Sequence, residues 1–561
     1  MGCGAVASHP TSFVPKCVKT FDYIIIGAGS AGCVLANRLS AQPSVRVALL
    51  EAGPPDNSAL IRTPAAVGGL LRHPVFNWNF NTTPQAHLAN RVIPVPRGRV
   101  LGGTGSINGM VYTRGHPRDF DEWAAAGNPG WSYREVLPYF IRSENNESLR
   151  DSPYHGVGGP MNVSDIVPHN PLVDRFVGAA LALGYLRRGD FNSAHQEGFG
   201  PRQATIRAGR RESTATAFLR PVTNRPNLTV FAHSMVRRIL LENGRAVGVE
   251  YESEGRTQEI HADAEVILSA GSIGSPHILM LSGIGDAEAL NSHGVAVHCH
   301  LPSVGRDLQD HLAITIKMRT RQTESYGLSA RTLPRALWIA ADYLLRRRGP
   351  LASNVFEAHG FVRTSPALDR PDIQLIFIPA HRNASGFPVP LGHGYGLNIA
   401  LLRPGSRGTV SLASRDPHTP PLIDPNFLEN RDDLAPLVRG FDIARRILAA
   451  TAFDSCKATE IAPGHDVRTE EQLERFIRQS AFTVFHPVGT CRMGGDSASV
   501  VDPELQVRGV RGLRVADASV FPTIVGGNTN AAVVMVAEKA ADLVLGRAPP
   551  APIDLQEKYG E

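Results

Sequence analysis

The sequence predicts an α/β fold with more than one domain, and three observations support this. The chain has 561 residues, which exceeds the size at which a single hydrophobic core usually stops growing. Two short apolar runs, residues 21–26 and 45–50, flank a glycine-rich turn and a helical pattern, as in a strand-helix-strand unit. Residues 326–474 carry helix and strand patterns without such a turn. We therefore expect a Rossmann-like dinucleotide-binding domain and a second, α+β domain.

The composition is that of a folded globular protein. Hydrophobic residues make up 42% and charged residues 19% of the chain, which lies outside the disordered range. The 57 basic residues exceed the 52 acidic ones by only five, so nucleic acid is not the expected partner. The six cysteines form no CxxC pair or zinc-like spacing, so we expect reduced thiols and no metal site.

The chain shows no apolar core of a secretory signal and no apolar run long enough to cross a bilayer. The sequence therefore predicts a cytoplasmic protein. Peripheral contact with the inner membrane stays open, because Arg346, Arg347 and Arg348 form a basic run. The run is interpreted as the solvated C-terminal end of a helix, where positive side chains interact favourably with the helix dipole.

The first predicted unit begins with a buried parallel strand at residues 21–26, since this run is β-branched and aromatic. Gly27, Gly29 and Gly32 follow, and residues 33–40 are predicted to be helical. In such a loop the first glycine permits the turn, the second lets backbone N–H groups approach a pyrophosphate, and the third lets helix and strand pack closely. The helix N-terminus then favours an anion.

Glu51 ends the second predicted strand, 51 − 32 = 19 residues after the third glycine. A carboxylate at this distance accepts a hydrogen bond from a ribose 2′-hydroxyl and repels a 2′-phosphate. The loop and Glu51 together predict a dinucleotide other than NADP. They do not distinguish FAD from NAD.

The remaining elements follow from periodicity and turn residues. Residues 228–251 and 257–269 alternate as strands around a turn at Asn243 and Gly244. The other predicted helices are 335–347, 432–450, 469–480 and 531–545, and the other predicted strands are 372–378, 396–403 and 513–517. We assign residues 21–165, 230–325 and 475–547 to the dinucleotide domain, 166–229 and 326–474 to the substrate-binding domain, 1–20 to a leader and 548–561 to a tail.

Three further segments carry a family resemblance. The first contains Gly98, Gly102, Gly103, Thr104, Gly105 and Asn108; the second contains Gly271, Ser272, Gly274, Ser275 and Pro276; the third contains His486, Pro487, Gly489, Thr490, Asp517, Gly527 and Asn528. With the N-terminal loop they resemble the glucose–methanol–choline (GMC) oxidoreductase family from about residue 21 to residue 545. Within it the chain is most similar to bacterial FAD-dependent alcohol dehydrogenases and choline dehydrogenases.

The resemblance implies FAD as the cofactor and assigns its neighbours. Gly27, Gly29, Ser30 and Gly32 would hold the pyrophosphate, and Glu51 and Ala52 would hold the adenosine ribose. Trp78 and Val236 would lie beside the adenine. The flavin and its ribityl chain would meet Gly103, Asn108, Gly109, Met110, Asp517 and Thr529. No histidine occurs between Gly102 and Asn108, where some relatives attach the flavin covalently, so non-covalent FAD is predicted.

His486 and Asn528 are the predicted catalytic pair. A neutral imidazole accepts a hydroxyl proton near neutral pH, and a fixed donor stabilises the developing alkoxide. By resemblance His486 is the base and Asn528 orients the substrate oxygen. His311 is interpreted as structural, and His359, His381 and His393 as core or solvent-exposed side chains.

The sequence thus predicts oxidation of a primary alcohol to the aldehyde, with hydride transfer to flavin N5 and electrons passed to a quinone or other acceptor. Choline dehydrogenase is the near alternative, although a quaternary ammonium needs an aromatic cage and only four tryptophans exist. An FAD-containing hydroxynitrile lyase and a photodecarboxylase are the non-redox alternatives. The alcohol, the choice between oxidase and dehydrogenase, and the oligomeric state stay open.

Overall fold

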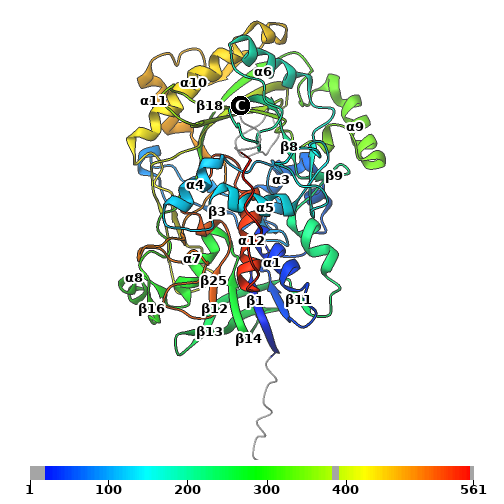
Figure 1. Cartoon of the computed structure of the whole chain (residues 1–561). Helices are drawn as coiled ribbons and strands as arrows, with labels where there is room; N and C mark the ends of the chain where they lie inside the picture. Colours follow the sequence, from blue (N-terminus) through cyan, green and yellow to red (C-terminus); the bar gives the residue numbers. More distant parts are fainter. Residues whose placement is uncertain (1–18, 382–390, 556–561) are drawn as a thin grey trace, which may run out of the picture.

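The computed structural model describes residues 19–381 and 391–555. Two seven-stranded sheets organise the chain, one in the lower and one in the upper half of Figure 1. Both draw strands from distant parts of the sequence, so the two halves are interleaved along the chain.

The first sheet has the order β11-β2-β1-β14-β13-β12, with β25 paired to β14. Strands β11, β2, β1, β14 and β25 are parallel neighbours, whereas β12, β13 and β14 form an antiparallel meander. The strands are β1 (Lys19–Ile26), β2 (Val47–Leu50), β11 (Leu228–Phe231), β12 (Ser234–Glu242), β13 (Arg245–Ser253), β14 (Arg256–Leu268) and β25 (Leu513–Val515).

Helices α1 (Ser30–Leu39) and α12 (Asn530–Val544) pack against each other beside β1, although they lie about 500 residues apart in sequence. Figure 1 shows this pair as blue and red helices. Because the parallel strands are covered, Ile24, Ile25 and Ile26 are all fully or almost fully buried.

The second sheet is antiparallel and has the order β23-β17-β20-β19-β18-β7, with β24 paired to β17. One face packs on helices α6 and α10 in a continuous apolar cluster. The strands are β7 (Gly198–Pro201), β17 (Leu312–Thr320), β18 (Ala358–Val362), β19 (Ile373–Ile378), β20 (His393–Leu401), β23 (Thr459–Ala462) and β24 (Phe482–Thr483).

The other helices and short strands connect or cover these sheets. The helices are α2 (Ala59–Arg62), α3 (Val67–Leu70), α4 (Pro117–Ala125), α5 (Tyr133–Ser143), α6 (Pro171–Ala182), α7 (Gly271–Leu281), α8 (Ala287–Ser292), α9 (Leu333–Arg346), α10 (Leu434–Leu448) and α11 (Glu470–Ser480). The short strands are β3 (Phe80–Asn81), β4 (Pro94–Val95), β5 (Glu144–Asn146), β6 (Met161–Asp165), β8 (Gln203–Ala204), β9 (Ile206–Arg207), β10 (Arg210–Arg211), β15 (Ile284–Gly285), β16 (Cys299–His300), β21 (Thr409–Ser411) and β22 (Leu422–Asp424).

The predicted α/β class is confirmed, with a parallel dinucleotide-side sheet and a second mixed α and β region. The predicted turn at Asn243 and Gly244 joins β12 to β13, and both residues adopt positive φ, as a two-residue hairpin turn requires. The predicted helix at 33–40 begins earlier, at Ser30, because the glycine loop itself supplies its N-cap, Gly29.

The domain boundaries remain a prediction. Strand β17 (Leu312–Thr320) is assigned by sequence to the dinucleotide domain, yet it hydrogen-bonds within the second sheet. Most of the predicted leader, with Cys3 and Cys17, lies outside the described residues. The four described cysteines are free thiols, and within the described ranges no helix is both long and apolar enough to cross a membrane.

Candidate functional site

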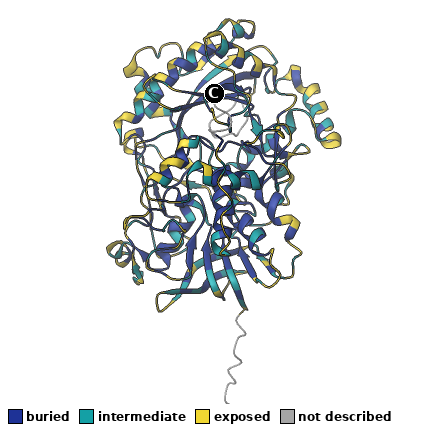
Figure 2. Cartoon of the chain, viewed as in Figure 1, coloured by how far each residue is buried: buried dark blue, intermediate teal, exposed yellow. Residues whose placement is uncertain are grey.

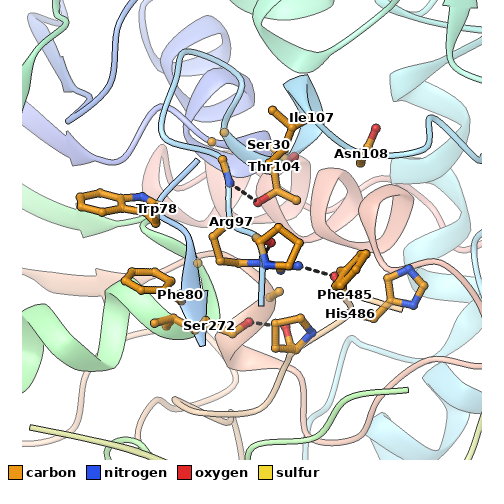
Figure 3. Close-up of a pocket in the computed structure, with 18 of the residues that line it drawn as sticks. Ser30, Trp78, Phe80, Arg97, Thr104, Ile107, Asn108, Ser272, Phe485 and His486 are labelled. Atoms are coloured by element: carbon orange, nitrogen blue, oxygen red, sulfur yellow. Dashed lines mark hydrogen bonds between the residues drawn. The ribbon is translucent and has the colours of Figure 1, made fainter. Parts of the chain in front are cut away.

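A cavity of about 580 Å³ lies between the two sheets. Its walls come from the glycine loop after β1, the start of α12, the segment from Pro96 to Val111, and one face of the second sheet. Figure 3 shows Trp78 and Phe80 at one end of this cavity and His486 at the other. A long, narrow ligand therefore fits between an aromatic end and a histidine end.

The glycine loop is shaped for a phosphate group. Gly27 has a φ of +95°, which favours glycine. Helix α1 begins without a side-chain cap at Gly29, and α12 begins without one at Thr529. Asn530 Nδ2 donates to Ser30 Oγ at 2.8 Å, which joins the two helix starts. Two uncapped N-termini therefore present backbone N–H groups to the cavity, where an anion is favoured.

Glu51 lies beside this loop and is buried. Its carboxylate accepts from the backbone N–H of Ala28 at 3.0 Å and from that of Gly53 at 2.9 Å. Burial raises the pKa of Glu51 to about 7, although these two donors oppose the shift. Each oxygen keeps a free lone pair, so the carboxylate can still accept from a ribose hydroxyl.

The aromatic end of the cavity is flat and positively charged. The Trp78 and Phe80 rings stack with centroids 5.7 Å apart and planes 4° apart, and the Arg99 guanidinium lies 5.0 Å from the Trp78 ring centre. Met235 and Val236 of β12 line the same cavity. These surfaces fit an adenine ring, which stacks on aromatic faces.

The middle of the cavity is fixed by buried polar contacts. Arg211 Nη1 donates to the backbone oxygen of Asn108 at 2.6 Å and to its Oδ1 at 2.9 Å. Asp517 accepts from the Gly271 N–H and the Ser275 hydroxyl at 2.8 and 2.6 Å. Burial raises the pKa of Asp517 despite these donors.

At the other end His486 and Asn528 lie in direct contact. His486 Nε2 is 3.1 Å from Asn528 Nδ2, and Asn528 Oδ1 accepts from the Thr113 hydroxyl at 3.2 Å. The Asn528 backbone N–H also donates to Thr113 Oγ1 at 3.0 Å. Asp310 Oδ1 accepts from the His486 backbone N–H at 2.8 Å. These bonds fix both side chains where they meet the cavity.

A second histidine sets the tautomer of His486. His311 Nε2 lies 3.1 Å from the Leu402 carbonyl oxygen, and His311 Nδ1 lies 3.0 Å from His486 Nδ1. A carbonyl only accepts, so His311 carries its proton on Nε2 and its Nδ1 accepts from His486 Nδ1–H. His486 Nε2 therefore keeps its lone pair, facing the Asn528 amide and the cavity.

Burial keeps both imidazoles neutral. It lowers the pKa of His486 well below 6.5, and repulsion from His311 when that ring is protonated, and from the Arg97 and Arg202 cations, lowers it further. Burial also lowers the pKa of His311 to about 3. A neutral imidazole with an unprotonated Nε2 is the form that accepts a proton from an alcohol.

The structure brings all but one of the sequence-predicted site residues to the cavity wall. Gly32 instead lies behind the loop, where an added Cβ would be 1.9 Å from the Gly27 carbonyl oxygen. The wall contains Gly27, Gly29, Ser30, Glu51, Ala52, Trp78, Gly103, Asn108, Gly109, Met110, Val236, His486, Asp517, Asn528 and Thr529.

Several lining residues were not predicted from sequence. Phe80, Arg97, Arg202 and Lys317 line the cavity, as do residues 417–421. Arg97 Nη2 donates to the Phe485 carbonyl at 2.6 Å. His381 lines the wall as well, whereas His359 and His393 are buried. Among the described residues no group of three His, Cys, Asp or Glu side chains is placed to hold a metal ion.

The fold and the site together define a dinucleotide-dependent oxidoreductase, because the cavity that joins the glycine loop, Glu51 and the aromatic end also contains a neutral histidine with an unprotonated Nε2. The family comparison makes this specific. Residues 21–313 and 404–537 match the N-terminal and C-terminal models of the GMC oxidoreductases. The chain belongs to the GMC oxidoreductase family, whose typical cofactor is FAD.

Individual relatives cover almost the whole chain. An acceptor-dependent alcohol dehydrogenase of Pseudomonas putida is 45% identical over 95% of this chain and 97% of its own. An oxygen-dependent choline dehydrogenase of Photobacterium profundum is 43% identical over 95% and 94%. Among solved structures, pyridoxine 4-oxidase from Mesorbium loti is 32% identical with a TM-score of 0.84, covering 94% and 100%. Formate oxidase is 28% identical with a TM-score of 0.88, covering 94% and 98%.

Proposed function

We propose that this enzyme oxidises a primary alcohol to the aldehyde with non-covalently bound FAD and passes the electrons to a quinone or another acceptor. The observation that carries the proposal is the Leu402-His311-His486 chain, which leaves His486 Nε2 unprotonated beside the Asn528 amide. The similarity to an acceptor-dependent alcohol dehydrogenase over 95% of the chain supports it.

In this proposal the substrate hydroxyl lies in the cavity within hydrogen-bond reach of both His486 Nε2 and Asn528 Nδ2, and takes the place of the direct contact between them. Asn528 donates to the alcohol oxygen and His486 accepts its proton, so negative charge develops where a donor is already in place. Bound FAD would supply the acceptor for the hydride that leaves the carbon bearing the hydroxyl, and the product would be an aldehyde. Thr113 holds the Asn528 amide so that its nitrogen faces the histidine.

The cofactor contacts are part of the same proposal. The uncapped starts of α1 and α12 would hold the pyrophosphate and the flavin end, Glu51 would hold the ribose, and Trp78 would lie beside the adenine. Non-covalent FAD is supported by the segment from Gly102 to Asn108, which contains no histidine. Denaturing the yellow protein in acid tests this: the flavin should be released into the supernatant.

Choline is the less favoured substrate because the site carries cations. The carboxylates in the described cavity wall are Glu51 and Asp517, and both lie on the dinucleotide side. The second sheet instead contributes Arg202 and Lys317 to the wall. Trp338 is 63% exposed on α9, outside that wall. A quaternary ammonium would meet repulsion and find no carboxylate on that side.

The non-redox alternatives have less support. A photodecarboxylase of this family pairs a cysteine with an arginine like Arg403, but no described cysteine lines the cavity, and Arg403 donates to Asp119 at 2.7 Å. A hydroxynitrile lyase would leave the flavin oxidised. The acceptor is proposed to be a quinone because an acceptor-dependent relative is similar, and peripheral contact with a membrane would bring the enzyme to it.

Anaerobic addition of a primary alcohol tests the function. Bleaching of the flavin absorbance supports alcohol oxidation, and its absence with every alcohol tested would support the lyase. His486→Ala should bind FAD but reduce it about 10² to 10⁴-fold more slowly, the usual contribution of a positioned base. Equal rates in the variant and the parent enzyme would contradict the role of His486.

A further inference from the structure

The alternation of side chains on the second sheet places two cations over the cavity. Thr315 and Lys317 of β17, Asn398 of β20 and Ile376 of β19 share one face and line the cavity, while Ile316, Leu397 and their neighbours face the apolar cluster on the other side. Arg202 follows β7 and joins this face, with its backbone N–H bonded to the Glu357 carbonyl at 2.9 Å.

Arg202 is buried without an acceptor. Its side chain is 2% exposed, and its Nε and Nη2 have no hydrogen-bond partner among the described residues. Burial lowers the pKa of Arg202 to about 9, and no carboxylate opposes that shift. The nearby Glu357 carboxylate accepts instead from the Asn170 N–H at 2.7 Å and the Tyr326 hydroxyl at 2.8 Å.

Other buried arginines of this chain are paired. Arg114 forms an ion pair with Glu144 at 2.5 Å, and Arg211 donates to Ile61, Gly105 and Asn108. A buried guanidinium with free N–H groups carries a large desolvation cost unless a ligand supplies the acceptors. Its planar fork matches a carboxylate, which can accept two parallel hydrogen bonds.

Arg202 is also close to the chemistry. Its charge lowers the pKa of His486 and of His359. Arg202 and His486 line the same cavity, whose wall also contains the apolar side chains of Phe356, Phe482 and Val484. A molecule with an alcohol at one end, an apolar middle and an anion at the other would satisfy each part of this wall.

We infer that the substrate is a primary alcohol that carries a carboxylate, which Arg202 binds while the hydroxyl lies at His486 and Asn528. This inference rests on the proposed alcohol oxidation and specifies its substrate class. Lys317 adds positive charge to the same wall. The apolar side chains of the same cavity wall, Phe356, Phe482 and Val484, would contact the carbon chain or ring.

The test compares ω-hydroxyalkanoates with 1-alkanols of equal chain length in anaerobic flavin reduction. The parent holoenzyme should prefer the hydroxy acid by tenfold or more in kcat/KM. In Arg202→Met the kcat/KM for the hydroxy acid should fall about 100-fold, because a charge-assisted bidentate contact is lost. The kcat/KM for the alkanol should change little. Arg202→Lys should retain part of the kcat/KM for the hydroxy acid. Arg319→Met is the control, because Arg319 is on the same sheet but exposed, and it should change the kcat/KM of neither substrate.

A binding measurement separates this inference from the proposed function. An alkanoate without a hydroxyl should perturb the flavin absorbance of the parent enzyme and not that of Arg202→Met. If no alcohol reduces the flavin but the alkanoate binds through Arg202, the proposed function fails and the anion site stands. Equal turnover of both substrate series by the parent enzyme, or an equal loss for both in Arg202→Met, would overturn the anion site.

Helix α9 exposes an apolar face to solvent. Leu333, Leu337 and Leu344 recur at a spacing of four and seven residues, and Trp338 and Leu345 lie beside them; their exposed fractions run from 57% to 82%. Within α9 only Tyr343 is buried. Figure 2 shows this helix as an exposed element at the upper right of the molecule.

Cations surround this apolar face. Arg331, Arg335, Arg346 and Arg348 are exposed, and Arg347 is partly exposed, whereas Asp342 is the acidic residue between Arg331 and Arg348. Arg346 forms a long contact of 3.5 Å with Asp342, and the Arg347 guanidinium lies 5.0 Å from the Tyr343 ring centre, whereas Arg331, Arg335 and Arg348 are exposed to solvent. Exposed leucine and tryptophan flanked by arginine is the pattern of helices that lie in a bilayer interface.

We propose that α9 docks the enzyme on an anionic phospholipid surface, with Leu333, Leu337 and Trp338 inserted and the arginines against the headgroups. The excess of arginine over acidic residues selects an anionic membrane over a zwitterionic one. Docking would give the enzyme access to an acceptor dissolved in the bilayer.

Flotation of the holoenzyme with vesicles tests this surface. Vesicles containing phosphatidylglycerol should bind the enzyme, pure phosphatidylcholine vesicles should bind it at least tenfold less, and high salt should release it. Leu337→Glu with Trp338→Glu should abolish binding, while Leu186→Glu, at a residue also 63% exposed, should not. Absence of binding to anionic vesicles, or a dimer that the double variant dissociates, would overturn the proposal.

Discussion

At the scale of single residues, the reactivity of His486 is set by its neighbours. The Leu402 carbonyl orients His311, His311 orients His486, and Thr113 orients Asn528. Each contact fixes which atom donates and which accepts. The outcome is a neutral imidazole with an unprotonated Nε2 beside the Asn528 amide.

The pH dependence of flavin reduction follows from this burial. The folded pKa of His486 lies well below 6.5, so its neutral form persists as the pH falls through 6.5. Flavin reduction at saturating alcohol should therefore stay nearly constant from about pH 8 to about pH 5.5, where an exposed imidazole would be about nine-tenths protonated. Stopped-flow reduction across this range checks it, and a tenfold fall centred near pH 6.5 would contradict it.

Replacing His311 should weaken the base without removing it. In His311→Ala the His486 Nδ1–H loses its acceptor, so the other tautomer becomes accessible and the reduction rate should fall by about tenfold, a loss of ~1.4 kcal/mol. His311→Gln should restore much of the rate, because its amide can donate to Leu402 and accept from His486.

FAD content and KM should change little in these variants, which distinguishes a positioning residue from a structural one. The limiting rate should also regain a pH dependence in His311→Ala that the glutamine variant lacks. Loss of FAD in both variants would instead assign His311 to the fold alone.

Sequence motifs predicted His486 and Asn528, but they could not predict His311 or Arg202 as parts of the site. The His311 to His486 contact spans 175 residues, and nothing local marks it. Arg202 carries no motif and gains its significance only from burial without an acceptor. A sequence motif can identify a site residue such as His486. The charges and hydrogen bonds around that residue come from side chains that are brought together only by packing of the folded chain.

At the scale of secondary structure elements, the unit of β1, α1 and β2 is the part most fully predicted from sequence. Its signals are local: an apolar run, a glycine turn and a carboxylate at a fixed distance. The second sheet is different, because β7 pairs with β18 about 160 residues later. Apolar alternation predicts that a strand exists but not which distant strand it pairs with, so the sheet order was not predictable.

Two glycines of the loop should respond differently to alanine. In Gly32→Ala the new Cβ would lie 1.9 Å from the Gly27 carbonyl oxygen, so α1 must move away from β1. We expect a loss of stability of about 1 to 3 kcal/mol or more together with loss of FAD. Thermal unfolding and flavin content measure both.

Gly29→Ala is the matched control, because its nearest neighbour would be the Ser269 oxygen at 3.7 Å. This variant should unfold at nearly the parent temperature as the apoprotein, yet bind FAD more weakly, since Gly29 lines the cavity in which FAD is proposed to bind. A Gly32→Ala protein with parental stability would show that the close packing of α1 on the loop is not required.

At the scale of the whole molecule, the cavity joins the two sheets. Its lining includes Gly27, which follows β1 of the first sheet, and Lys317 of β17 in the second sheet. A cofactor in this cavity contacts residues that are assembled only when both halves are folded. FAD should therefore bind the native state and not the unfolded chain.

Removal of FAD should consequently lower the stability of both halves together. If FAD binds non-covalently, as proposed above, a concentration of 100 times its Kd adds about 2.7 kcal/mol to the free energy of unfolding, so the Tm of apoprotein should rise steadily as FAD is added. Calorimetry measures the Tm, and tryptophan fluorescence reports on the first half, where Trp123 and Trp131 are buried. The two signals should shift in parallel, because one ligand stabilises one joint cavity. A Tm independent of added FAD, or a shift confined to the fluorescence signal, would mean that the cofactor does not couple the two sheets.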